Sequence, residues 1–191
     1  YDLLIVGARD HPGPGELLLG FVAHRLVKHA KVSVLVVRKP IVQSIRHILV
    51  CTSGPDAGKN TVRTGAHLAD TSGAIATLLY VASSVPSMYA GLSRFGEGLA
   101  DLLQTDTPIA RHLRSCAELI QTSDIDARVE LRHGLPAEEI LRSAEVDETD
   151  LIVIGGSSRR GLKAMLWDEV SMQIVTNATR PVLVVRGVFD H

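Results

Sequence analysis

The chain has few of the features that mark several large classes of protein. Its 191 residues contain 4% aromatic residues and one Trp, and 20 basic against 21 acidic residues give a formal net charge of −1. Nucleic-acid-binding domains depend on a basic surface and often on stacking aromatic rings, so this composition argues against a nucleic-acid partner. No apolar run reaches the roughly 18 residues that a membrane-spanning helix needs, so we expect no membrane partner either.

Cysteine is also scarce. Cys51 and Cys116 are the only two, and both lie in apolar segments. Disulfide-based scaffolds carry many more cysteines, so we expect two free, buried thiols and a reducing, cytoplasmic setting. The chain starts at Tyr1 rather than Met, which raises the expectation of an upstream portion in the natural protein.

What the chain does contain is an internal repeat. Residues 2–38 align without a gap onto residues 150–186, at a constant offset of 148 residues. Matched positions include Gly13, Leu18, Val22, Val27 and Ala30 with Gly161, Leu166, Val170, Val175 and Ala178. The second copy ends a long unit, whereas the first copy is too short to form a core of its own. The repeat therefore predicts half a domain at residues 1–38, a linker at 39–46 and a complete domain at 47–188.

Short apolar runs alternate with helical patterns in this complete unit. Strands are expected at residues 48–51, 74–81, 127–131, 151–154 and 182–185, and helices at 56–70, 107–122, 135–144 and 163–176. Strict alternation with apolar strands is typical of a parallel sheet with helices on both faces. We therefore expect an α/β fold with a doubly wound, parallel, five-stranded sheet.

Two further segments complete the sequence pattern. A β-α-β half-domain (residues 3–6, 16–29 and 32–37) is expected to precede the five-stranded sheet. Residues 83–106 fit no regular element, and their many small and polar residues indicate a functional or mobile insertion.

The loop after residue 154 is the richest in chemistry. It reads Gly155, Gly156, Ser157, Ser158, Arg159, Arg160, Gly161, Leu162 and Lys163. Ligands of doubly wound sheets bind at the carboxyl ends of the strands. Small residues there let backbone amides approach a phosphate at the start of the next helix. A plain strand-to-helix turn with solvated basic residues explains the same pattern equally well.

This strand, glycine loop, helix and strand block occurs twice and resembles the carboxyl-terminal half of the universal stress protein family. A Gly-x-Pro turn at residues 134–136 extends the resemblance over nearly the whole chain. The resemblance implies an adenine nucleotide alpha hydrolase-like fold and dimerisation through the last strands. Residues 34–37 would then pair with residues 182–185, as a homodimer or a pseudo-dimer, and cover two apolar edges.

The chain departs from the ATP-binding motif of that family. Binders carry Gly-x-x-Gly followed, after a fixed spacing, by Gly-Ser or Gly-Thr, and these positions hold Gly155, Ser158, Asp168 and Glu169 here. The aspartate that binders place after the first strand is matched by Ser53. Like charges about 4 Å apart cost about 4 kcal/mol at an effective dielectric near 20. One charge-assisted amide contact returns about 1.5–3 kcal/mol, so ATP is disfavoured unless Mg²⁺ bridges the carboxylates to phosphate.

These observations define a candidate site and two interpretations. The candidate nucleotide-binding residues are Ser53, Val81, Gly155, Ser157, Ser158, Asp168, Glu169 and Val170. We interpret the protein as a non-catalytic stress-response protein that acts through dimerisation or protein partners, with a degenerate nucleotide site and no cofactor or metal. The alternative is an adenine-nucleotide-binding stress sensor that uses ATP with Mg²⁺ and has at most weak ATPase activity.

Other sequence patterns are weaker evidence for a functional site. Residues 53–60 resemble a Walker A loop, but Ser53 replaces the first glycine and Asn60 stands where the magnesium-binding hydroxyl belongs. Pro55 and Ala57 disagree with the phosphate loop of ATP-adenylating enzymes. The histidines, His112 among them, are predicted to have packing or surface roles.

Overall fold

The computed structural model of the chain describes residues 2–8, 20–38, 44–54, 58–82, 98–121, 125–156 and 162–187. The elements in these ranges are β1 (Leu3–Gly7), α1 (Phe21–His29), β2 (Ser33–Val37), β3 (His47–Thr52), α2 (Gly58–Ser72), β4 (Ile75–Ala82), α3 (Leu99–Gln104), α4 (Pro108–Gln121), β5 (Ala127–His133), α5 (Pro136–Val146), β6 (Leu151–Gly155), α6 (Leu162–Asn177) and β7 (Val182–Val185). Every strand and helix expected from the sequence is present, with boundaries shifted by a few residues.

The helix α3 is the element that the sequence did not predict. It lies inside residues 83–106, of which residues 83–97 are outside the described part of the chain. The Arg114 guanidinium, from α4, donates to the carbonyl oxygen of Thr105 at 2.9 Å and to that of Leu103 at 2.5 Å. A helix of one or two turns held by such a tertiary contact leaves too short a periodic pattern to be recognised.

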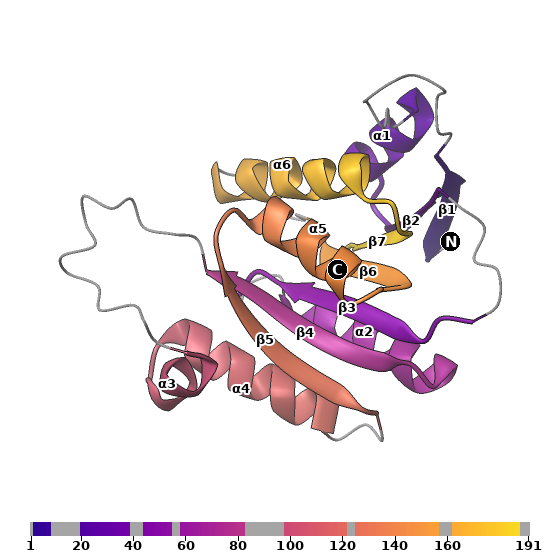
Figure 1. The fold of residues 1–191 in the computed structure, drawn as a ribbon. Helices are drawn as coiled ribbons and strands as arrows, with labels where there is room; N and C mark the ends of the chain where they lie inside the picture. Colours follow the sequence, from indigo (N-terminus) through magenta and orange to yellow (C-terminus); the bar gives the residue numbers. More distant parts are fainter. Residues whose placement is uncertain are drawn as a thin grey trace.

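The described strands form one sheet in the order β1-β2-β7-β6-β3-β4-β5 (Figure 1). Neighbouring strands are parallel except for β2 and β7, which are antiparallel. The sheet therefore has seven strands rather than the five expected for the complete domain alone, because β1 and β2 extend it. The physical reason is that β2 covers the edge of β7 within one chain.

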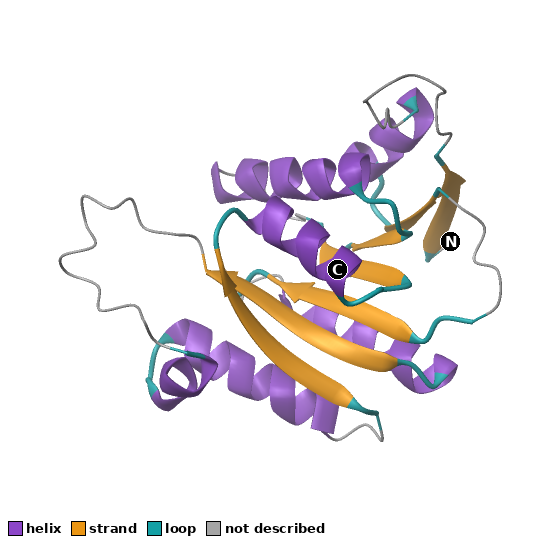
Figure 2. Cartoon of the chain, in the orientation of Figure 1, coloured by secondary structure: helices purple, strands orange, loops and turns teal. Residues whose placement is uncertain are grey.

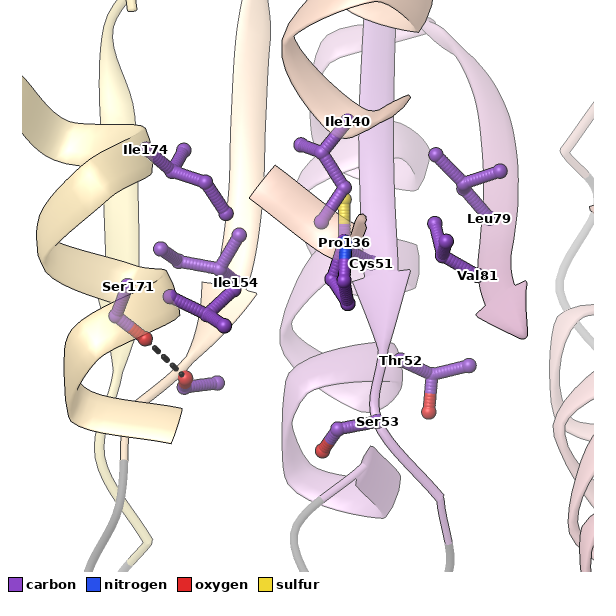
Figure 3. Close-up of a pocket in the computed structure, with 12 residues that line it drawn as sticks. Cys51, Thr52, Ser53, Leu79, Val81, Pro136, Ile140, Ile154, Ser171 and Ile174 are labelled. Atoms are coloured by element: carbon purple, nitrogen blue, oxygen red, sulfur yellow. Dashed lines mark hydrogen bonds between the residues drawn. The ribbon is translucent and has the colours of Figure 1, made fainter. Parts of the chain in front are cut away.

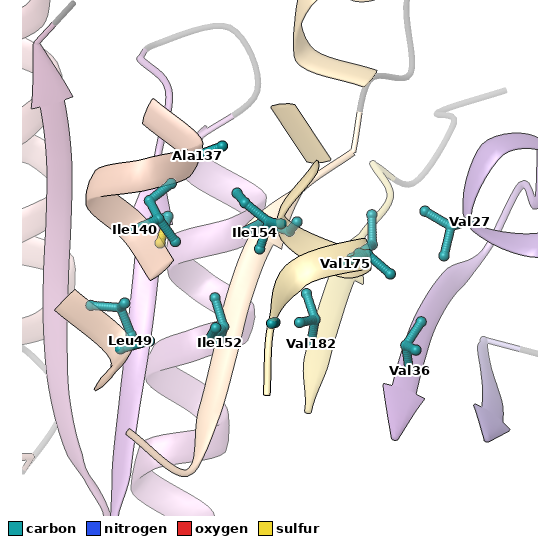
Figure 4. Close-up of a cluster of buried hydrophobic side chains, with 14 of the residues drawn as sticks. Val27, Val36, Leu49, Ala137, Ile140, Ile152, Ile154, Val175 and Val182 are labelled. Carbon is teal, nitrogen blue, oxygen red and sulfur yellow. The ribbon is translucent and has the colours of Figure 1, made fainter. Parts of the chain in front are cut away.

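Helices lie on both faces of this sheet, as Figures 1 and 2 show. Helices α1, α5 and α6 bury one face, where Val27, Ile140 and Val175 pack against strand residues such as Ile152 and Val182 (Figure 4). Helices α2 and α4 bury the other face, where Val62, Ala66 and Cys116 pack against Ile48 and Val153. Period-two alternation sends successive strand side chains to opposite faces, which is why each strand contributes to both clusters.

The two repeats meet about an approximate two-fold axis. In the antiparallel pair, Leu35 lies opposite Leu183, flanked by Val34 with Val184 and Val36 with Val182. Leu35 and Leu183 are equivalent positions of the repeat, since they are 148 residues apart. The register is therefore the one that two identical chains would adopt around a two-fold axis.

Two arginines repeat this symmetry. Arg38 follows β2 and donates to the carbonyl oxygens of Val175 and Thr176 at 2.9 and 2.6 Å. Arg186 follows β7 and donates to the carbonyl oxygen of Val27. Arg38 and Arg186 are equivalent in the repeat, and so are Val27 and Val175. Each repeat thus reaches across to the same turn of the other repeat's helix.

Candidate functional site

A crevice opens at the carboxyl ends of β3 and β6, where the strand order reverses. This is the place where doubly wound sheets bind ligands. The crevice is narrow, with a cavity volume of about 20 Å³. Its lining consists of Cys51, Thr52, Ser53, Leu79, Val81, Pro136, Ile140, Ile154, Gly155, Val170, Ser171 and Ile174 (Figure 3).

The structure brings four of the eight candidate residues together in this crevice. Ser53 follows the last residue of β3, Val81 lies near the end of β4, Gly155 ends β6 and Val170 lies on α6. Ser157 and Ser158 are outside the described residues. Whether the four residues bind a nucleotide stays a prediction.

Asp168 and Glu169 are not among the residues that line the crevice. They line a separate groove between α6 and α1, together with His24, Val27, Lys28, Ser171, Met172 and Arg186, with about 660 Å³ of empty space. Successive residues of a helix project about 100° apart. Val170 therefore lines the crevice, whereas Asp168 and Glu169 line the groove toward α1.

The Asp168 carboxylate lies near the guanidinium of Arg186. Arg186 Nη1 lies 3.9 Å from Asp168 Oδ1, and the Arg186 side chain is 8% exposed. Burial lowers the pKa of Arg186 and the Asp168 charge raises it, so the carboxylate offsets part of the cost of burying the guanidinium. Asp168 therefore stabilises the contact between the repeats.

The described lining of the crevice is poor in reactive groups. It contains no carboxylate, imidazole, lysine or arginine, and its polar side chains are those of Thr52, Ser53, Ser171 and Cys51. Ser171 donates from Oγ to the carbonyl oxygen of Gly155 at 3.2 Å (Figure 3). Burial raises the pKa of the Cys51 thiol well above its ordinary value, so Cys51 stays protonated and unreactive at neutral pH.

Sequence reasoning missed a buried polar cluster beside the crevice. His112 of α4 is 3% exposed, and its Nε2 lies 2.7 Å from Thr52 Oγ1. Cys116 Sγ lies 3.5 Å from the same nitrogen, and burial raises the pKa of this thiol to about 11. The signal was present, because His112 and Cys116 share a helix face with Ile120 at a spacing of four residues.

This cluster fixes the end of β3. Burial, and then the charge of Lys59, lowers the pKa of His112, so the imidazole is neutral at pH 7. The Thr52 hydroxyl is committed to this imidazole and packs against Gly58, where an added Cβ would meet Thr52 Oγ1 and His112 Nε2. The first turn of α2 is thereby held against the strand end.

Two kinds of site are absent from the described residues. Within the described ranges, no three His, Cys, Asp or Glu side chains gather in a way that would hold a metal ion. No helix among the same residues has the length and apolarity needed to cross a membrane.

The sequence pattern of the universal stress protein family matches this chain over residues 1–38 and 44–186. The chain belongs to the universal stress protein family. It is 29% identical over 143 residues to universal stress protein MJ0531 of Methanocaldococcus jannaschii, a match that covers 74% of this chain and 82% of that protein.

Solved structures of this family share the fold. The crystal structure of a universal stress protein from Archaeoglobus fulgidus DSM 4304 has a TM-score of 0.73 at 20% identity. The match covers 97% of this chain and 62% of that chain, so this universal stress protein spans less than two thirds of that relative. A universal stress protein solved in complex with cAMP has a TM-score of 0.55 at 18% identity, covering 75% of this chain and 98% of that chain.

Proposed function

We propose that this universal stress protein is non-catalytic and acts through assembly and protein partners, with a nucleotide site that has lost its function. The observation that carries this proposal is the absence, from the described lining of the crevice, of any side chain able to transfer a proton or hold a phosphate charge. General acid–base catalysis needs a titratable group within hydrogen-bond reach of the reacting atom. The Cys51 thiol does not supply one, because burial keeps it protonated.

Two features of neighbouring residues support the same proposal. Ser53 stands where nucleotide binders of the family place an aspartate. Asp168 is paired with Arg186 in the adjacent groove, so its carboxylate is not directed at the crevice. A Mg²⁺ ion bridging protein to phosphate would need oxygen ligands at the crevice itself. The protein is thus expected to hold neither ATP nor a metal.

The second candidate is an adenine-nucleotide-binding sensor. It is favoured by the place of the crevice, at the reversal of strand order, and by its apolar floor of Leu79, Ile140 and Ile154, which suits a base. One structural relative was solved with cAMP. Binding without turnover would agree with the same lining, because an apolar floor can hold a base while no side chain acts on the phosphates.

The first experiment separates these two functions. The freshly purified protein is denatured and the supernatant is searched for nucleotides by mass spectrometry, and the native protein is then titrated with Mg-ATP and with cAMP in a thermal-shift assay. A ligand at 100 times its Kd stabilises by about 2.7 kcal/mol, and each kcal/mol raises the Tm by about 2–4 °C in a domain of this size. We expect no released nucleotide and no shift at millimolar ligand.

Restoring the motif provides the matched comparison. We expect Ser53→Asp, which places a carboxylate in the crevice, to gain a shift with Mg-ATP that the parent lacks, with Ser53→Ala as the control. A released adenine nucleotide, or a shift in the parent, would contradict the loss of the nucleotide site and favour the sensor.

A further inference from the structure

The groove between α1 and α6 is a second cavity of the molecule, and the proposed function gives it no role. Part of its empty space is open to solvent, and its cavity volume is about 240 Å³, compared with about 20 Å³ for the crevice. Pockets for drug-sized ligands are about 300–1,000 Å³, and a cavity of roughly 150 Å³ already holds a benzene molecule. The groove therefore has room for a small metabolite.

This groove lies at the junction of the two repeats. One wall is α1 of the first repeat and the other is α6 of the second, and the two helices lie next to each other on one face of the sheet (Figure 1). Val170 and Ile174 line the crevice but not the groove, so the groove uses another face of α6. Ser171 lines both cavities, but its hydroxyl donates to the carbonyl oxygen of Gly155. The groove is therefore a site distinct from the nucleotide crevice.

The two walls carry opposite charges. His24 and Lys28 stand four residues apart on α1 and so share one face of that helix. Asp168 and Glu169 belong to the wall formed by α6. Within the described part of the chain, Lys28 forms no ion pair with either carboxylate. The groove thus presents a basic wall and an acidic wall that do not neutralise each other.

Between these walls lie two apolar side chains and a buried arginine. Val27 is 2% exposed, and Met172 is partly buried against the same cluster. A thioether side chain adapts to ligands of different shape. The Arg186 guanidinium donates to the carbonyl oxygen of Val27 and lies 3.9 Å from Asp168, so both Arg186 and Asp168 already have partners in the protein. The charges that remain for a ligand are those of Lys28 and Glu169.

This distribution of charge disfavours simple ions. A phosphate attracted by Lys28 would meet the carboxylates of Asp168 and Glu169, and a simple cation attracted by those carboxylates would meet Lys28. A molecule that carries both charges is complementary to both walls. Packed helices have axes about 8–10 Å apart, so the two charges of the ligand must be well separated. Two extended residues span up to about 7 Å, which is long enough, whereas a single amino acid is shorter.

We propose that the groove between α1 and α6 binds a zwitterionic molecule of about the size of a dipeptide. Its carboxylate contacts Lys28, with His24 as a second donor, and its ammonium group contacts Glu169. Its apolar side chain packs against Val27 and Met172. The ligand therefore contacts both repeats at once. This inference goes beyond the proposed function, which concerns the crevice and protein partners.

Isothermal titration calorimetry of the full chain with glycyl-leucine tests this site. Two blocked analogues separate the contributions of the two charges, because the carboxyl-terminal amide lacks the negative charge and the N-acetyl form lacks the positive charge. We expect glycyl-leucine to bind with a Kd below about 1 mM. Each blocked analogue should bind about tenfold more weakly, since it loses one charge-assisted contact.

Two substitutions assign each end of the ligand to its wall. In Lys28→Gln we expect glycyl-leucine and its amide to bind equally, while N-acetylation still weakens binding about tenfold. In Glu169→Gln we expect the reverse, so that only amidation weakens binding. A general disturbance of the fold would not remove one penalty and leave the other. The matched controls are Lys31→Gln and Glu145→Gln, which should keep both penalties because these side chains are exposed and lie outside the groove.

Two results would overturn the proposal. One is the absence of binding at millimolar glycyl-leucine, by calorimetry and by thermal shift. The other is binding that keeps both penalties in Lys28→Gln and in Glu169→Gln, which would place the dipeptide elsewhere on the protein. Neither substituted residue lines the crevice. A failure here therefore leaves the test with Mg-ATP and cAMP intact, and a nucleotide bound in the crevice leaves this test intact.

Discussion

His112 is the residue that most clearly links one side chain to a measurable property of the protein. It is buried between Thr52 and Cys116, and its pKa is lowered by burial and then by Lys59. The direction of the pH dependence follows from the lowered pKa of His112. The folded protein resists protonation of His112, whereas the unfolded chain takes up a proton below about pH 6.5. The contribution of His112 to stability is therefore complete above pH 6.5 and decreases as the pH falls toward the lowered pKa.

We expect the free energy of unfolding to fall between pH 7.5 and pH 5, and His112→Gln to flatten this dependence. Urea unfolding at several pH values measures both. The control is His24→Gln, since His24 is exposed on α1 and its replacement should leave the slope unchanged. An equal slope in the His112 variant and the parent would show that other groups govern the acid response.

The contact of His112 with Thr52 could not be predicted from the sequence. The histidines were assigned packing or surface roles, and a packing role is what His112 has, but its contact with Thr52 joins α4 to the end of β3. Residues 52 and 112 are far apart in sequence, and a single pair of polar residues has no period. The orientation of the Asp168 side chain could not be predicted for a related reason, because it depends on where α1 packs.

At the scale of elements, α2 packs tightly against β3 at Gly65. An added Cβ at Gly65 would lie 2.5 Å from Val50 Cγ2 and 2.9 Å from Cγ1. Overpacking of this kind costs about 1–3 kcal/mol, and the gain in helix propensity from Gly to Ala returns up to about 1 kcal/mol. We expect Gly65→Ala to destabilise the protein by about 1–2 kcal/mol in urea unfolding.

Two companion variants make that measurement specific. Gly7→Ala meets open space and should change stability by about 0.5 kcal/mol or less. In a Val50→Ala background the obstructing methyl groups are gone, so Gly65→Ala should lose its cost. A cost that persists in this background would place the strain elsewhere.

The pairing of β2 with β7 provides the second prediction at this scale. Leu35 lies opposite Leu183 and packs against the cluster beneath α2. Leu35→Asp would bury a charge without a partner, so we expect a loss of roughly 2–5 kcal/mol and a fall in solubility as the β7 edge is uncovered. Urea unfolding and analytical sedimentation measure these effects, with exposed Ile5→Asp as the mild control. Unchanged stability and assembly in Leu35→Asp would show that this strand pairing contributes little.

The whole molecule illustrates what a repeat can and cannot predict. The order of strands and helices followed from periodicity, and the contact of residues 34–37 with residues 182–185 was expected from the resemblance and is present. The strand count of five referred to the complete domain alone, and the expected pairing, formed within one chain, extends the sheet to seven strands. The groove between α1 and α6 was not predicted, since it exists only where the two repeats meet.

The approximate two-fold axis also lets the two sides of one interface differ. Position 168 is an aspartate that lies 3.9 Å from Arg186, whereas the equivalent position in the first repeat is Gly20, which has no side chain. Ser33 accepts a hydrogen bond from the Arg186 backbone at 3.1 Å, whereas its equivalent is Pro181. In a homodimer each substitution would appear on both sides at once. In a single chain, a substitution changes one side of the interface between the repeats and leaves the other side unchanged.

The pairing of β2 with β7 within one chain also determines how the protein responds to dilution. Two separate chains that meet through such an edge come apart on dilution, because their association depends on concentration. Strands that belong to one chain meet at an effective concentration set by the connecting segment, which for short connections is in the millimolar range. The paired state of this protein is therefore independent of how many copies a cell contains, and it is the same in the first molecule synthesised as in the last.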